Sequence, residues 1–184
     1  TARANGFGFL LESVTWRASR DWGEKLGYTA EELADANRQS IALLLELRAS
    51  YERANFPMIV SGAIGPRGDG YVAGEMMSNA EAEDYHCEQI ATLAGTRADM
   101  IGAYTMTNAA EAIGIVRAAQ TYAIPVAVSF TTETDGNLPT GQRLADAIAE
   151  VDAATSAAPV YYMINCAHPT HFDHTLSGND GWTG

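Results

Sequence analysis

Five short apolar segments alternate with longer helical segments along this chain, and this alternation restricts the fold more than any other feature. The apolar segments span residues 7–14, 57–61, 99–104, 124–130 and 160–165. Each is a short, mainly apolar run, as expected for a parallel strand that is buried on both faces of a sheet. Strands that alternate with helices in this way predict one α/β domain with a parallel sheet.

The helical segments carry start signals that place them between the strands. Thr29 with Glu32, and Ser78 with Glu81, form capping-box patterns that predict helices over about 29–53 and 78–94. Asn108 is predicted to cap a helix that ends near residue 122, and a further helix is predicted to begin at residue 140. In the first of these helices, the predicted buried stripe includes Leu33, Ile41, Leu44, Leu45 and Tyr51.

Two architectures fit this alternation: a doubly wound open sheet and a (β/α)8 barrel. No G-x-G-x-x-G segment follows a strand to open a helix, so the dinucleotide-binding fingerprint is absent. Polar residues lie where the strands end, which is the layout of the loops that carry barrel active sites. These residues are Thr15, Ser61, Thr105, Ser129, Thr131 and Asn165. A closed barrel needs eight strands and about 250 residues, whereas this sequence supplies five strands in 184 residues.

Composition and charge argue against several functional classes. The formal net charge of −12 would repel a phosphate backbone, so nucleic-acid binding is not expected. No apolar segment approaches the roughly 20 residues needed to span a bilayer, and the first residues lack the apolar core of a signal peptide, so no membrane association is expected. The two cysteines, Cys87 and Cys166, do not make a disulfide framework, which favours a reducing, cytoplasmic location.

The last apolar strand ends at Asn165, and Cys166 follows it directly. In α/β folds this end of the sheet carries the chemistry. A thiolate there can be a metal ligand or a nucleophile, and the simpler alternative is a small buried side chain. His168, His171 and His174 follow at a spacing that could also bind zinc, but Pro169 interrupts the run. A role for His168 in orienting or shielding a metal is favoured over direct binding, and the simpler alternative is a solvated loop.

Five segments of this chain form an ordered set. They are T-W-R-A-S at 15–19, S-G-A-I-G-P-R-G-D at 61–69, the stretch 105–112, Ser129-Phe130 and Asn165-Cys166. In this order, the first three are similar to segments usually written T-Y-x-A-S, G-x-x-G-P-x-G-D and E-T-x-x-x-x-E-A. The fourth is similar to the end of the next strand, and the fifth to a segment written N-C. This order, which covers about residues 7–172, resembles the homocysteine S-methyltransferase family.

The resemblance implies a (β/α)8 barrel of the TIM type. Residues 1–184 would form a single partial domain that covers roughly strands two to six and is incomplete at both ends. Three cysteines bind Zn²⁺ in that family. The resemblance implies that Cys166 is the first of them, and that the other two belong to an adjacent pair beyond this sequence. It places Thr15, Gly65, Thr105, Ser129 and Asn165 at the substrate site.

The resemblance also implies a reaction. A methyl group would pass from a sulfonium donor, S-methylmethionine or S-adenosylmethionine, to the thiol of homocysteine, which gives methionine. Zinc coordination would remove the thiol proton near neutral pH and leave the sulfur able to attack.

One position departs from the family pattern. The family usually has Glu directly before the residue numbered Thr105 here, where it helps to hold the amino acid, and this chain has Tyr104. A tyrosine can form a hydrogen bond but supplies no fixed negative charge to an ammonium group. The alternative hypothesis is therefore a catalytically inert, truncated paralogue that acts as a binding or structural protein.

Residues 62–70 are expected to form a tight glycine-rich loop whose N–H groups donate to a substrate carboxylate. Trp16 is expected either to cover a cationic donor through a cation–π contact or to pack under a loop. Five strands of a barrel would expose two sheet edges, which favours aggregation or a homo-oligomer.

Overall fold

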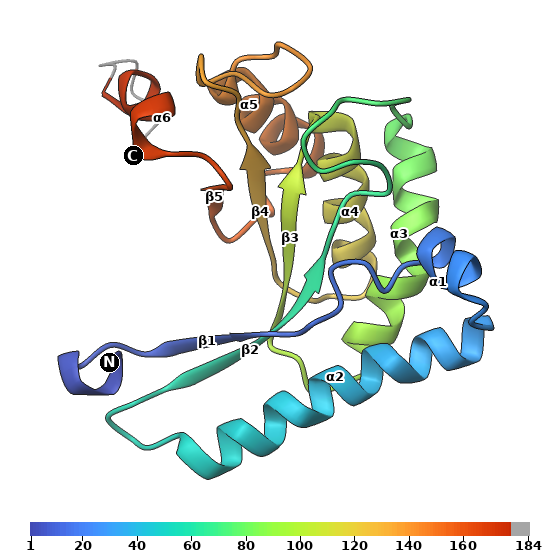
Figure 1. Cartoon of the computed structure of the whole chain (residues 1–184), viewed down its shortest axis with the longest axis vertical. Coiled ribbons are helices and arrows are strands. Elements are labelled where there is room, and N and C mark those ends of the chain that lie inside the picture. The colour runs from blue at the N-terminus through green and yellow to red at the C-terminus, as the bar shows by residue number, and fades with distance from the viewer. Residues whose placement is uncertain (178–184) are drawn as a thin grey trace.

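The computed structural model describes residues 1–177, which form a five-stranded parallel sheet with helices along one side (Figure 1). The strands are β1 (Phe9–Glu12), β2 (Met58–Ile64), β3 (Met100–Met106), β4 (Val126–Thr131) and β5 (Tyr162–Asn165). Each strand pairs with the next along the chain, and the sheet curls into half of a barrel. The strand order never reverses, so the prediction of a TIM-type barrel rather than a doubly wound sheet is confirmed.

Four long helices cover the convex side of the sheet (Figure 1). They are α2 (Ala30–Tyr51), α3 (Asn79–Ala94), α4 (Ala109–Thr121) and α5 (Leu144–Thr155). Shorter helices are the 3-10 helix η1 (Arg3–Asn5), α1 (Arg20–Leu26) after β1, and α6 (Pro169–Leu176) after β5. No described helix combines the length and the apolar character needed to cross a membrane.

The strand register decides which side chains face the helices. Leu11 lies on the helix side, in a core that also contains Ile41 and Leu44 of α2. The next residue, Glu12, pairs with Ser61 of β2 and faces the opposite, concave side, because successive side chains alternate across a sheet. Large, fully buried side chains of the core include Ile64, Ile90, Leu93, Ile101, Met106, Ile113, Ile115, Phe130 and Leu144. Their burial between sheet and helices is the main source of stability.

The predicted helix starts are present. The backbone N–H of Thr29 donates to the Glu32 carboxylate at 2.9 Å, and the Thr29 hydroxyl accepts the backbone N–H of Glu32. Ser78 and Glu81 form the same reciprocal pair at the start of α3. The side chain of Asn108 accepts a backbone N–H in the first turn of α4 at 2.8 Å. Local sequence therefore determines where these helices begin.

Several boundaries differ from the predictions. The sequence pattern does not reveal α1, because its seven residues are too few to show a periodic stripe. α5 begins at Leu144 rather than at residue 140, because the preceding segment turns back and bridges Asn137 to Arg143. β2 continues to Ile64, so the first three residues of the predicted loop 62–70 belong to the strand. β1 and β5 are both shorter than the apolar segments that contain them.

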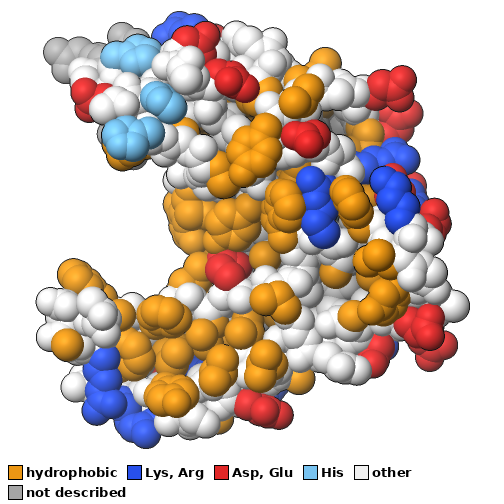
Figure 2. Space-filling model, in the orientation of Figure 1, with side chains coloured by type: hydrophobic (Ala, Val, Ile, Leu, Met, Phe, Trp, Pro, Cys, Tyr) orange, Lys and Arg blue, Asp and Glu red, His pale blue; other side chains and the backbone are white. Residues whose placement is uncertain are grey.

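The two edges of the sheet, β1 and β5, are bordered by exposed apolar side chains. Tyr51 was expected to be buried but is 59% exposed, because it ends α2 beside the edge strand β1. With Phe9 and Leu47 it borders a shallow apolar hollow. Val160 and Tyr161 are exposed beside β5, and Figure 2 shows hydrophobic side chains on the walls of the open concave side. Self-association through these edges stays a prediction.

Candidate active site

The carboxyl ends of β3, β4 and β5 meet at the side chain of Asn165. Its Oδ1 accepts the backbone N–H of Thr105 at 3.0 Å and the hydroxyl of Ser129 at 2.7 Å. Its Nδ2 donates to Sγ of Cys166 at 3.0 Å. Four of the residues predicted from sequence, drawn from three strands, therefore form one hydrogen-bonded group.

Cys166 lies immediately after β5 and its side chain is exposed. Its backbone φ is 57°, in the left-handed region that residues with a Cβ seldom adopt. The proximity of its thiol raises the pKa of the Tyr71 hydroxyl, which lies in the loop between β2 and α3. The alternative of a small buried side chain is wrong for Cys166, because its side chain is exposed and its thiol accepts a hydrogen bond from Asn165.

Thr105 also has a left-handed backbone, with φ of 64°. The pairing of β3 with β4 is irregular between Ala103 and Met106, and this irregularity frees the Thr105 N–H to reach Asn165. On the other side, the indole N–H of Trp16 donates to the Thr105 hydroxyl at 3.0 Å. Backbone strain of this kind concentrates at functional sites, where surrounding contacts hold it in place.

Thr15 and Gly65 support this group from the neighbouring strands. The Thr15 hydroxyl donates to the carbonyl oxygen of Ala63 at 2.7 Å, so it ties the chain after β1 to β2. The Gly65 N–H donates to the carbonyl of Trp16 at 2.9 Å. A Cβ at Gly65 would lie 2.5 Å from that carbonyl oxygen and 2.6 Å from the indole nitrogen, so only glycine fits. Gly65 thereby lets the indole reach Thr105.

Arg17 occupies one face of the Trp16 indole. The guanidinium carbon lies 4.1 Å from the ring centroid, and the same group donates to the carbonyls of Pro66 at 2.8 Å and Gly68 at 2.6 Å. The cation–π contact of Trp16 is therefore made with a cation of the protein itself. Its effect is to anchor the loop after β2 against the segment after β1.

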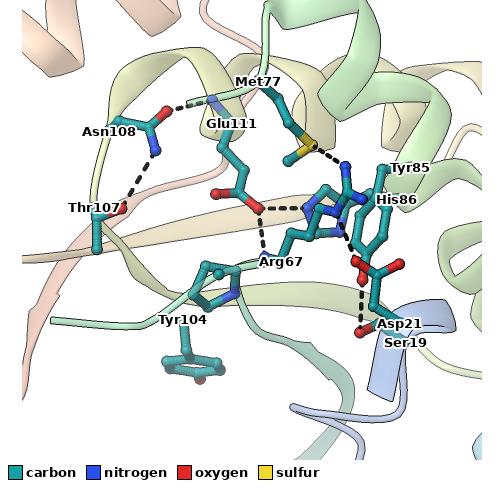
Figure 3. Close-up of polar contacts among 12 residues, drawn as sticks. Ser19, Asp21, Arg67, Met77, Tyr85, His86, Tyr104, Thr107, Asn108 and Glu111 are labelled. Atoms are coloured by element: carbon teal, nitrogen blue, oxygen red, sulfur yellow. Dashed lines mark hydrogen bonds and ion pairs between the residues drawn. The ribbon is translucent and has the colours of Figure 1, made fainter. Parts of the chain in front are cut away.

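A buried carboxylate anchors the same loop from the other side (Figure 3). Oε1 of Glu111 accepts the backbone N–H of Arg67 at 2.7 Å and lies 2.9 Å from Nε2 of the buried His86. The Arg67 side chain pairs with Asp21 of α1 at 2.8 Å. Asp21, Arg67 and Glu111 border a cavity of about 560 Å³. The backbone N–H groups of Gly65 and Arg67 are thus used within the protein and are not available to a substrate carboxylate.

Glu12 is a candidate site residue that the sequence analysis misses. The hydroxyl of Tyr104 on β3 donates to its carboxylate across β2. Burial raises the pKa of Glu12, and the hydrogen bond from Tyr104 partly offsets this rise. Burial and the bond to Glu12 raise the pKa of Tyr104 as well. A charged residue inside the apolar segment 7–14 is the signal that could have revealed Glu12.

The described residues do not bring three metal-ligating side chains together. The alternative site of three histidines is not formed. His168 instead contacts the Thr170 hydroxyl at the start of α6, and Nε2 of His174 lies 3.1 Å from the carbonyl oxygen of Asp135. A catalytic zinc usually has three protein ligands. Of the predicted ligands, residues 1–177 contain Cys166 alone, so the described residues do not by themselves fit the ion.

Comparison with known proteins agrees with this geometry. The sequence profile of the family described as homocysteine S-methyltransferase matches residues 6–180. The chain belongs to the homocysteine S-methyltransferase family. A curated relative from this comparison, the selenocysteine Se-methyltransferase of Brassica oleracea var. italica, is 24% identical over 181 residues, which cover 87% of this chain and 52% of that protein. This family member therefore spans about half the length of its curated relative.

Solved structures of the homocysteine methyltransferase MmuM from Escherichia coli share the fold. The metallated form superposes with a TM-score of 0.82 at 18% identity and covers 95% of this chain and 65% of MmuM. The apo form gives a TM-score of 0.74 at 19% identity over 95% of this chain and 64% of MmuM. The likeness supports the half-barrel architecture of this family member.

Proposed function

We propose that this chain takes part in methyl transfer from a sulfonium donor, S-methylmethionine or S-adenosylmethionine, to the thiol of homocysteine, which gives methionine. Family membership supports transfer to a thiol-type acceptor. The observation that carries the proposal is the group formed by Thr105, Ser129, Asn165 and Cys166. It lies at the carboxyl ends of the strands, where barrel enzymes hold their substrates.

The chemistry requires a deprotonated acceptor and an aligned donor. A bond forms between the acceptor sulfur and the methyl carbon, the bond from that carbon to the donor sulfonium breaks, and a neutral thioether leaves. The acceptor thiol loses its proton beforehand, because the thiolate is the nucleophile. The residues of this chain contribute mainly placement, which can supply a large part of the acceleration.

The five predicted substrate-binding residues divide into two proposed roles. Thr105, Ser129 and Asn165 present polar groups beside the exposed thiol, where a substrate would bind. Thr15 and Gly65 act through their neighbours, because the contacts of Thr15 hold two strands together and Gly65 gives the Trp16 indole its space.

We propose Cys166 as one thiolate ligand of Zn²⁺. When bound, such an ion removes the proton from a coordinated thiol near neutral pH. Residues 1–177 supply only this ligand. Their own contribution is therefore the placement of the sulfur, which Asn165 fixes by donating to Sγ at 3.0 Å.

A selenol acceptor is the second candidate, because the curated relative is named a selenocysteine Se-methyltransferase. Homocysteine and selenocysteine both carry an ammonium and a carboxylate, so one site could hold either. A reducing, cytoplasmic compartment suits both reactions, because the two free cysteines and the acceptor must stay reduced.

The test supplies each donor with a labelled methyl group, together with homocysteine or selenocysteine, and follows the product by mass spectrometry. We expect labelled methionine or methylselenocysteine with the wild type, loss of product in C166A, and retention in the matched control C87A. Because Cys166 is exposed, C166A should keep its thermal unfolding temperature. A wild-type chain that binds homocysteine without transferring label would favour the inert paralogue.

Metal dependence is tested separately. Chelation should abolish product formation and added Zn²⁺ should restore it. Activity that survives complete chelation would show that the zinc proposal is wrong while leaving methyl transfer intact.

A further inference from the structure

Glu12 places a carboxylate on the concave wall of the half-barrel. It is the last residue of β1 and pairs with Ser61, on the face opposite the helices. The hydroxyl of Tyr104 reaches over from β3 to donate to Oε1 of Glu12. Burial and the negative charge of Glu12 raise the pKa of Tyr161, which adjoins β5. The charge of Glu12 on β1 therefore affects a tyrosine beside β5. Figure 2 shows a small acidic patch among the hydrophobic side chains of the concave side.

No ion pair identified among the described residues includes the Glu12 carboxylate. Ion pairs among these residues join Arg38 to Asp35, Arg48 to Asp99, Arg67 to Asp21 and His86 to Glu111. Its second oxygen, Oε2, is buried and has no hydrogen-bond partner among the described residues. A buried acceptor without a partner is unfavourable, and more so when it is charged.

A purely structural role does not explain the charge. The donors near Glu12 are neutral hydroxyls: Tyr104 donates to Oε1, and the adjacent Ser61 hydroxyl also lowers the pKa of Glu12. A glutamine carbonyl would accept from these hydroxyls equally well. The carboxylate adds a desolvation cost that glutamine would avoid. Groups that lower stability in this way are typical of binding sites, where a ligand supplies the missing partner.

We propose that Glu12, oriented by Tyr104, binds the ammonium group of an amino-acid substrate inside the hollow. An ammonium has three donors and a positive charge, which match an anionic oxygen that lacks a partner. Tyr104 directly precedes Thr105, whose N–H donates to Asn165, and Asn165 in turn donates to the Cys166 thiol. The carboxylate is therefore connected to the thiol through three hydrogen bonds and one pair of adjacent residues. This inference rests on the proposed function, because it assigns the amino end of the substrate whose sulfur lies near Cys166.

Binding measurements test the assignment without requiring turnover. The affinities of homocysteine and of its des-amino analogue, 4-mercaptobutanoate, are measured by calorimetry for the wild type, E12Q and the matched control E24Q. Glu24 is exposed on α1, so E24Q changes the net charge equally without touching the hollow. We expect E12Q to weaken homocysteine binding roughly 10- to 100-fold while leaving the analogue unchanged. E24Q should behave as the wild type.

The ammonium could belong to the acceptor or to the donor, and S-methylmethionine distinguishes them. If only the affinity for S-methylmethionine falls in E12Q, then Glu12 holds the amino group of the donor. An E12Q variant that keeps the wild-type preference for both amino acids over the analogue would overturn the proposal, as would a wild type without such a preference.

Two further measurements, thermal unfolding and methyl transfer, distinguish a loss of ammonium binding from a damaged fold and from a failure of the proposed function. E12Q should unfold at the same or a higher temperature than the wild type, so weakened binding would not reflect a damaged fold. Loss of amino-acid discrimination together with absence of methyl transfer in the wild type would support the Glu12 assignment and contradict the methyltransferase activity. Methyl transfer by the wild type together with unchanged amino-acid discrimination in E12Q would support the methyltransferase activity and contradict the Glu12 assignment.

Discussion

Oδ1 of Asn165, at the end of β5, accepts the backbone N–H of Thr105, at the end of β3, at a distance of 3.0 Å. The same oxygen accepts the hydroxyl of Ser129 from the strand between them, at 2.7 Å. One side chain thus holds three strand ends in a fixed relation beside Cys166. The strained backbone of Thr105 persists because this contact and the Trp16 indole hold it from both sides.

The first prediction concerns this contact. N165A leaves the Thr105 N–H and the Ser129 hydroxyl without their acceptor, which should lower the free energy of unfolding by about 1–3 kcal/mol. N165D keeps an acceptor oxygen for both donors and should lose less than N165A. Urea denaturation of the two variants measures the difference. Equal losses would show that the acceptor oxygen of Asn165 is not the stabilising feature.

The second prediction concerns the close approach at Gly65. In G65A the new methyl group would lie 2.5 Å from the carbonyl oxygen of Trp16, so the backbone has to move. We expect a loss of about 1–3 kcal/mol in unfolding free energy, together with reduced methyl transfer. G68A is the matched control in the same loop, because a Cβ at Gly68 meets no atom within 4 Å. A G65A variant as stable as G68A would contradict the observed packing.

The third prediction separates hydrogen bonding from aromatic packing. W16F removes the indole N–H that donates to the Thr105 hydroxyl and should reduce the free energy of unfolding by about 1 kcal/mol beyond the loss of ring volume. Nε1 of Trp22 is buried with no partner among the described residues, so W22F removes an unsatisfied donor of the same kind. W22F should therefore be less damaging than W16F in thermal unfolding. The opposite order would argue against the indole contact with Thr105.

The fourth prediction is a pH dependence of stability. Burial raises the pKa of Glu12 in the fold above its ordinary value of 4.5, so the folded chain holds its proton to higher pH than the unfolded chain does. Stability from this group is complete below about pH 4.5 and is lost as pH rises through the folded pKa.

E12Q has no such proton to lose, so its unfolding temperature should match the wild type in acid and exceed it by a few degrees at neutral pH. Unfolding scans of the wild type, E12Q and E24Q from acid to neutral pH test this. An E12Q variant that is less stable than the wild type at neutral pH would contradict a desolvated Glu12 carboxylate.

Much of the local structure follows from the sequence, because its causes are local. Capping side chains at Thr29, Ser78 and Asn108 satisfy N–H groups a few residues away, so their helix starts are predictable. The apolar segments locate every strand, although the strand ends shift by a few residues. α1 and the segment before α5 are less predictable, because a helix of seven residues and an irregular turn leave no periodic pattern.

The candidate site divides in the same way. Asn165 and Cys166 are recognisable as the end of a buried strand, and their order among the other segments indicates the family. The sequence cannot show that the Thr15 hydroxyl donates to the carbonyl of Ala63, or that Trp16 leaves no room for a Cβ at Gly65. Those contacts join residues about 50 positions apart in the chain.

The sequence by itself therefore determined the alternation of strands and helices, the helix caps and the thiol at the end of the last strand. Only the tertiary structure decided that Tyr104 meets Glu12 and that Thr105 meets Asn165. The physical reason is that strand pairing and curvature set the distance between side chains on different strands. A one-residue slip of register would turn Glu12 from the hollow into the helix layer, and the register is held by burial of side chains such as Leu11 against the helices, which is a tertiary contact.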